Sequence, residues 1–251
     1  MLETNKIELN NGLKIITEQI PFLRSVSIGI LIGAGSGNEI PQESGISHLI
    51  EHMCFKGTER HSAYDIAYKL DSVGGKINAF TSKEQTMYYA VVLDQHIDVA
   101  IDILCDILLN SKFDPKDMAL EKNVILEEIK MYEDTPDELV HDLFAEKILQ
   151  GHPIGRPTIG FKDIIEAISN HDIDEYMNKW YTPENTTIAI AGAIPDDTTE
   201  RIMSYLDHWE GKTTALQPNY PSVKAGIHLK RKKTEQVHLC LGAQGPSQLD
   251  K

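Results

Sequence analysis

The chain has 251 residues, of which 41% are hydrophobic and 25% are charged, and its formal net charge is −14. These proportions are typical of an ordinary globular protein with a sizeable core, in one large or two small domains. The acidic balance argues against a nucleic-acid binder, and the apolar runs are too short to span a bilayer; the charge fits either plain solubility or a basic substrate.

The first predicted elements are β-strands. The residues at 10–12, Asn-Asn-Gly, lie between two short apolar runs and are typical of a tight hairpin. A further strand is expected at 26–32. The glycine cluster that follows it, at 33–37, lacks the spacing of a dinucleotide-binding loop, so we interpret it as a turn.

The next element is a helix expected at 44–55, which carries the motif His48-Leu49-Ile50-Glu51-His52. Histidines four residues apart project from one face of a helix, about 5–6 Å apart at Cβ, and can bind one zinc ion. Glu51 lies on the same side and can accept a proton from water at such a site. Ser44 or Ser47 is expected to cap the helix. The alternative is a pair of core histidines that satisfy hydrogen bonds.

Blocks of helices and pairs of strands make up the rest of the pattern. Asp114 precedes Pro115, which is typical of a helix start. This organisation predicts an α+β fold with a mainly antiparallel sheet covered by helices. Further helices are expected at 62–73, 96–110, 115–133, 136–150, 162–169, 173–180 and 195–209, and further strands at 76–82, 86–93, 186–193 and 236–241.

A zinc centre needs a third protein ligand, which we expect from the helix at 115–133. Glu121 and Glu128 are seven residues apart and share a face of this helix. One of them could bind the metal while the other orients a metal ligand. A solvated acidic face would carry the same residues, and the spacing alone leaves the choice between Glu127 and Glu128 open.

The number and spacing of the cysteines indicate in which cellular compartment the protein is expected. Cys54, Cys105 and Cys240 lie far apart and are odd in number, which is typical of free thiols in a reducing environment. The segment at 1–6 lacks a basic region followed by an apolar one, so no secretory signal is expected. These features predict a cytoplasmic protein that is not bound to a membrane.

The chain resembles the M16 (pitrilysin or insulinase) family of zinc metallopeptidases, in the style of the bacterial processing proteases that are similar to the mitochondrial processing peptidase β-subunit. The resemblance implies the metallohydrolase fold that such peptidases share with S-ribosylhomocysteine lyase. The segments that carry it follow the order of the family, at 45–58, 74–86, 121–129 and 152–160.

The resemblance implies a role for each residue of the site. Zinc is the implied cofactor, with His48, His52 and Glu128 as its ligands. Glu51 corresponds to the catalytic base. Glu121 corresponds to a catalytic-site carboxylate that orients one of the zinc ligands. The substrates implied are peptides, bound by β-augmentation on an edge strand that contains Asn78, Ala79 and Phe80.

Family members carry two homologous halves, which implies a division of this chain. Residues 1–215 correspond to the zinc-binding peptidase domain, 216–226 to a linker, and 227–251 to the opening of a second domain. The expected activity is zinc-dependent peptide hydrolysis that stays weak without the second half or a partner subunit, and the resemblance also admits a homodimer. The alternatives are a non-catalytic scaffold subunit and a related metal lyase.

Overall fold

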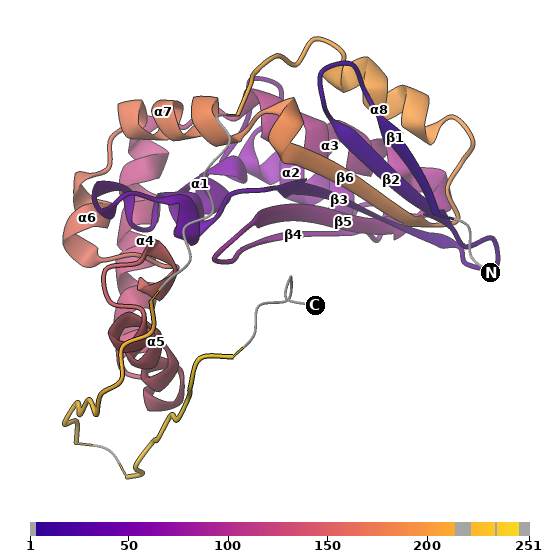
Figure 1. The fold of residues 1–251 in the computed structure, drawn as a ribbon. Helices are drawn as coiled ribbons and strands as arrows, with labels where there is room; N and C mark the ends of the chain where they lie inside the picture. Colours follow the sequence, from indigo (N-terminus) through magenta and orange to yellow (C-terminus); the bar gives the residue numbers. More distant parts are fainter. Residues whose placement is uncertain (1–3, 214–221, 234, 246–251) are drawn as a thin grey trace.

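The computed structural model of the chain describes residues 4–213, 222–233 and 235–245. Its centre is a six-stranded sheet in the order β1-β2-β6-β3-β5-β4, shown in Figure 1. Neighbouring strands are antiparallel except β2 and β6, which confirms the predicted α+β fold with a mainly antiparallel sheet. The strands are β1 (Thr4–Glu8), β2 (Lys14–Gln19), β3 (Ser25–Ile32), β4 (Lys76–Thr81), β5 (Thr86–Leu93) and β6 (Thr186–Gly192).

The helices cover one face of the sheet and one end of it. In Figure 1, α3 and α8 lie over the sheet, while α4 and α5 stand at its end. Each helix begins and ends within three residues of its predicted range. The helices are α1 (Ile46–Cys54), α2 (Ala63–Asp71), α3 (Ile97–Asn110), α4 (Pro115–Glu133), α5 (Pro136–Ile148), α6 (Lys162–Ala167), α7 (Asn170–Trp180) and α8 (Thr198–Leu206).

The core lies between the sheet and this helical layer. In β3, Val26, Ile28, Ile30 and Ile32 are buried, while Ser27 and Leu31, which alternate with them, are more exposed. Because side chains alternate between the two faces of a strand, the β-branched residues of β3 all meet the helices. α3 packs directly on β3 and β5, and its own apolar face completes the core.

The strand β4 forms one edge of the sheet and pairs with β5. The Ser82 N–H donates to the Gln85 carbonyl at 2.8 Å, in the same register as the β4–β5 ladder. Hydrogen-bonded pairs alternate along an antiparallel ladder, so the backbone groups of Ala79 and Thr81 point to the free edge. Consistent with this, the Ala79 N–H is bonded to the Asn78 side-chain oxygen at 2.9 Å.

The helix α1 begins differently from the prediction. Its N-cap is Gly45 with a φ of 95°, so neither Ser44 nor Ser47 caps it. A side chain at Gly45 would also lie within 3 Å of the Gly160 backbone. The buried carboxylate of Glu39 instead accepts the Gly45 N–H at 2.8 Å and the Ser47 N–H at 3.1 Å. The cap therefore comes from six residues upstream, which local sequence rules do not reach.

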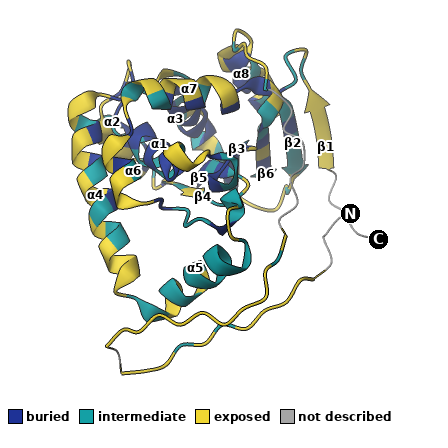
Figure 2. Cartoon of the chain, turned by 60° about the vertical axis from the view of Figure 1, so that its left-hand side comes forward, coloured by how far each residue is buried: buried dark blue, intermediate teal, exposed yellow. Residues whose placement is uncertain are grey.

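The C-terminal described residues form no helix or strand, so the strand predicted at 236–241 is wrong. Val237 and Leu241 are 97% and 84% exposed, because no neighbouring strand covers or pairs with this segment within the described part. Figure 2 shows it as a long exposed stretch beside α5. Much of the predicted linker at 216–226 lies outside the described residues, and the predicted domain boundaries stay predictions.

The helices differ in length and in apolar character. Within residues 4–213, 222–233 and 235–245, none combines the length and the apolar character that crossing a bilayer requires.

Candidate metal centre

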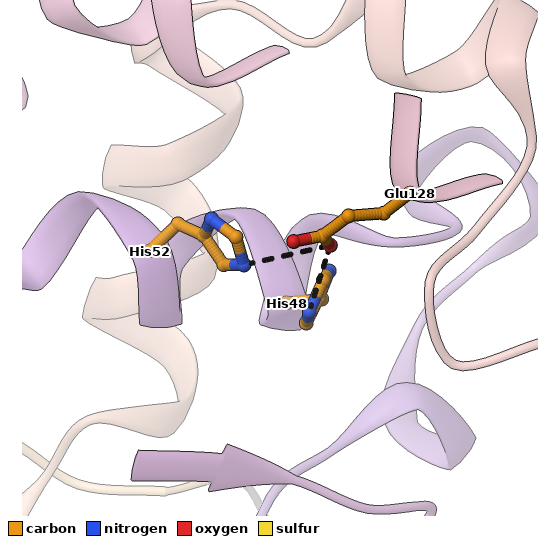
Figure 3. Close-up of side chains that lie close together, drawn as sticks. All are labelled: His48, His52 and Glu128. Atoms are coloured by element: carbon orange, nitrogen blue, oxygen red, sulfur yellow. Dashed lines mark ion pairs between the residues drawn. The ribbon is translucent and has the colours of Figure 1, made fainter. Parts of the chain in front are cut away.

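The two histidines of the motif lie on one face of α1, where α1 packs against α4. The His48 and His52 rings are 4.6 Å apart. Glu128 reaches them from α4, with its Oε2 3.9 Å from His48 Nε2 and 3.8 Å from His52 Nε2, as Figure 3 shows. Of the residues that the structure describes, these three form the group whose ligand atoms, all within 4.8 Å of one another, could hold a metal ion.

This donor set fits zinc. Two imidazoles and one carboxylate leave a fourth tetrahedral position open, which is the arrangement of a catalytic zinc site. Atoms bound to zinc at about 2.0–2.1 Å lie about 3.4 Å apart in a tetrahedron. The distances of 3.8 and 3.9 Å are therefore close to that geometry and too long for hydrogen bonds between the ligands themselves.

The protonation of His48 also suits metal binding. Its pKa is lowered to about 4, first by burial and then by the neighbouring His52. At neutral pH the imidazole is therefore uncharged, which is the form that binds a metal. The ring Nδ1 of His48 is buried and has no hydrogen-bond partner among the described residues.

Glu121 lies behind His52 as a buried carboxylate on α4. Its Oε2 is 3.0 Å from His52 Nδ1 and accepts the N–H there, which leaves the lone pair of Nε2 directed at Glu128. The other oxygen is 2.5 Å from Lys56 Nζ, which balances the buried charge. Sequence reasoning missed Lys56, because this residue follows the end of α1 and no spacing rule connects it with α4.

The neighbouring carboxylate, Glu127, points away from the histidines. Its side chain is 73% exposed and lies 2.6 Å from Lys130 Nζ. Of the two carboxylates between which the spacing left the choice open, Glu128 and not Glu127 lies beside His48 and His52.

Glu51 lies between the two histidines in the sequence and accepts a hydrogen bond from the Thr81 hydroxyl at 2.5 Å. Burial raises the pKa of Glu51, and the negative charge of Glu128 adds to this, while the Thr81 hydrogen bond and His52 oppose it. A carboxylate with a raised pKa is a stronger base than an ordinary carboxylate, which suits a group that accepts a proton from water. Thr81 was not singled out from the sequence, because its contact with Glu51 depends on the packing of β4 against α1.

The predicted peptide-binding residues Asn78, Ala79 and Phe80 lie on the edge strand β4. Ala79 packs against the core, whereas Asn78 and Phe80 are exposed. An edge strand of this kind has backbone groups available for an added strand. Their binding of peptides stays a prediction.

Comparisons with known proteins place these features in context. The family described as Insulinase (Peptidase family M16) matches residues 14–162, and the family described as Peptidase M16 inactive domain matches residues 167–251. The chain is 43% identical over 235 residues to the uncharacterized zinc protease YmxG of Bacillus subtilis, which covers 94% of this chain and 58% of that protein. It is 40% identical over 251 residues to the uncharacterized zinc protease SCO5738 of Streptomyces coelicolor, which covers 96% and 55%. The chain thus spans little more than half the length of these relatives.

Solved structures show the same fold. A protease from Helicobacter pylori matches with a TM-score of 0.83 at 22% identity, over 89% of this chain and 55% of that one. The periplasmic protease PqqL from Escherichia coli matches with a TM-score of 0.77 at 22% identity, over 87% of this chain and 25% of that one. The boundary between the two family matches falls inside this fold, since β6, which follows it, lies between β2 and β3.

Proposed function

Because the chain belongs to the insulinase family of peptidases, M16, we propose that it is a zinc-dependent endopeptidase acting on extended peptides. Zinc is its cofactor: the relatives quoted above are named zinc proteases, and the donor set of the site fits this ion. The observation that carries the proposal is the convergence of His48, His52 and Glu128 on the helix face beside Glu51.

The residues have distinct tasks in the proposed reaction. Zinc, when bound, supplies Lewis-acid chemistry that activates water and polarises the scissile carbonyl. Glu51 accepts the proton of the attacking water and passes it to the leaving amine. Glu121 holds His52 in the tautomer whose Nε2 is free to bind. The free edge of β4 pairs with the substrate backbone next to Glu51.

We further propose that full activity needs a second half of the family's kind, supplied by more chain, by a partner subunit or within a homodimer. In support, the chain spans 58% and 55% of the length of two zinc protease relatives. A cytoplasmic location is also proposed, since Cys54, Cys105 and Cys240 are all free thiols.

A second candidate function is that of a non-catalytic scaffold subunit. The observation that favours it is the match of residues 167–251 to the family described as an inactive domain. The complete set of His48, Glu51, His52 and Glu128 favours the peptidase instead.

The variant Glu51→Gln separates these functions. The wild-type chain should bind one zinc ion by metal analysis and slowly cleave a mixture of fluorogenic peptides. The variant should keep the zinc and lose about 10²–10⁴-fold in rate or more, because it lacks the proton acceptor. A wild-type chain that binds no zinc would support the scaffold, and undiminished cleavage by zinc-loaded Glu51→Gln would contradict the role of Glu51. Rapid proteolysis by the pure 251-residue chain would overturn the need for a second half.

A further inference from the structure

We propose that Thr81 is a positioning residue that couples the pairing of a peptide along β4 to the orientation of Glu51. The inference rests on the function proposed above. It assigns to one residue two tasks, one for its backbone at the free edge of the sheet and one for its hydroxyl at the carboxylate of Glu51.

The backbone of Thr81 is placed for pairing. Thr81 is the last residue of β4 and lies opposite Thr86 of β5. The hydrogen bond from Ser82 N–H to Gln85 fixes the alternation of the ladder, so the Thr81 N–H and C=O face the free edge, as those of Ala79 do. A peptide added to this edge therefore bonds to Ala79 and Thr81 in turn.

The side chain of Thr81 points the other way, to α1. Its hydroxyl donates to Glu51 Oε2 at 2.5 Å, a short bond of the charge-assisted kind. Within the described part of the chain, Thr81 is the residue whose side chain donates a hydrogen bond to the Glu51 carboxylate. Because one oxygen is held, the carboxylate has a fixed rotation, and Oε1 is left as the acceptor for a proton.

The free edge is partly closed before a peptide arrives. The Ala79 N–H is bonded to the Asn78 side chain at 2.9 Å, so a pairing peptide must replace this local bond. Pairing at Ala79 and Thr81 then immobilises the end of β4, and the Thr81 hydroxyl with it. Glu51 is thereby held most firmly when an extended peptide lies along the edge, which favours extended segments as substrates.

The test compares Thr81→Val with Thr81→Ser. Valine keeps the β-branched shape that suits a strand but removes the donor, while serine keeps the donor. Cleavage of a fluorogenic peptide is followed with the full chain, zinc-loaded and in excess, so that a slow single turnover suffices. We expect Thr81→Val to lower the maximal rate about 10–100-fold with the half-saturating concentration within about twofold, and Thr81→Ser to restore the rate to within about threefold.

Binding measurements distinguish positioning from simple damage to the fold. Zinc affinity by chelator competition should be equal in the wild type and in Thr81→Val. The affinity for a labelled extended peptide, measured by fluorescence anisotropy in the Glu51→Gln background, should also be equal. Ala79→Pro, which removes an N–H from the free edge, should weaken peptide binding in the same assay. Equal losses of rate in the valine and serine variants, or weakened zinc binding in Thr81→Val, would overturn the inference.

The link between Thr81 and Glu51 can be tested separately from the proposed peptidase activity. If the wild type cleaves no peptide, the peptidase proposal falls, and a double-mutant cycle in the metal-free protein tests the link itself. The effects of Thr81→Val and Glu51→Ala on the free energy of unfolding should be non-additive, because each removes one partner of the same bond. Additive effects would overturn the coupling of Thr81 to Glu51.

Discussion

In the described part of this fold, His52 and His61 each share a hydrogen bond with a buried carboxylate, and the two rings have different surroundings. His52 Nδ1 lies 3.0 Å from Glu121, and His61 Nδ1 lies 2.7 Å from Asp106. In both pairs the carboxylate accepts a hydrogen bond from the ring Nδ1–H. This assigns both rings to the tautomer that has a lone pair on Nε2. The carboxylate behind the ring therefore does not distinguish the two histidines.

The difference lies beyond Nε2. The Nε2 of His52 faces Glu128 Oε2 at 3.8 Å, a distance that leaves room for an ion between them. The Nε2 of His61 is likewise 3.8 Å from a carboxylate oxygen, that of Asp102, but Lys69 Nζ lies 2.5 Å from this nitrogen and its ammonium donates to the lone pair. A lone pair bonded to an ammonium cannot bind a cation. A histidine is therefore a candidate metal ligand only when its free nitrogen faces another ligand atom and no cationic side chain already occupies the space between them.

The pair at His61 has a structural task instead. Asp106 lies on α3 and accepts hydrogen bonds from Thr58 and from Asn110. Thr58 and His61 belong to the loop between α1 and α2, so this network fastens the loop to the core helix. Its members are satisfied by protein groups, as buried polar groups generally are.

The largest expected effect comes from His52→Ala, with His61→Ala as the matched control. Structural zinc sites with four ligands bind with about 10–16 kcal/mol, so one ligand contributes on the order of 3–4 kcal/mol, and His52→Ala should weaken zinc binding about 10²–10³-fold. His61→Ala should leave zinc affinity within about threefold. It should lower the free energy of unfolding by about 1–3 kcal/mol, because buried Asp106 loses a donor. Chelator competition measures the zinc affinity and urea unfolding measures the stability. Similar losses of zinc affinity in both variants would show that the two histidines do not differ as metal ligands.

The site shows how far sequence reasoning reaches. His48, Glu51 and His52 were predictable as a group, because one helix face fixes their spacing. The seven-residue interval drew attention to Glu121 and Glu128, but the rotation of α4 about its axis decides which carboxylate meets α1. That rotation is set by packing between helices far apart in the sequence, so the residues alone could not supply it.

The fold follows the same division between local and distant causes. Alternation and helical periodicity gave the strands and helices to within three residues, because those signals are local. The cap of α1 by Glu39 and the contact of Thr81 with Glu51 depend on tertiary packing, so no local pattern indicated them. The strand expected at 236–241 had a suitable local pattern but lacks a partner strand among the described residues, and a strand exists only when it is paired.

In the metal-free protein, the burial of His48 makes the free energy of unfolding depend on pH. His48 is buried and its pKa is lowered to about 4, against about 6.5 in the unfolded chain. Between pH ~6.5 and pH ~4 the folded protein therefore binds fewer protons than the unfolded chain. The stability that neutral His48 contributes is complete above pH ~6.5 and is lost toward pH ~4, by up to about 3 kcal/mol.

His48→Gln does not titrate at this position and provides the control. The difference in unfolding free energy between metal-free wild type and this variant should fall steadily from pH 7 to pH 4, measured by urea unfolding at each pH. Other groups, including Glu39, are present in both proteins and cancel to first order. A difference that stays constant over this range would show that burial does not hold His48 neutral.

The smallest effect is expected for the carboxylates behind the two rings. Glu121→Gln keeps an oxygen that can accept from His52 Nδ1 but loses the charge that faces Lys56, so the amide is free to turn. Removing an outer partner of a zinc ligand typically costs 10–100-fold in affinity, and we expect a loss in about this range. Asp106→Asn should leave zinc affinity unchanged and lower stability by about 1–3 kcal/mol, because the hydrogen bonds that meet at Asp106 are disturbed. If the two variants lost zinc affinity equally, the carboxylate behind the ring would matter through the stability of the fold alone, and the distinct role given to Glu121 would be wrong.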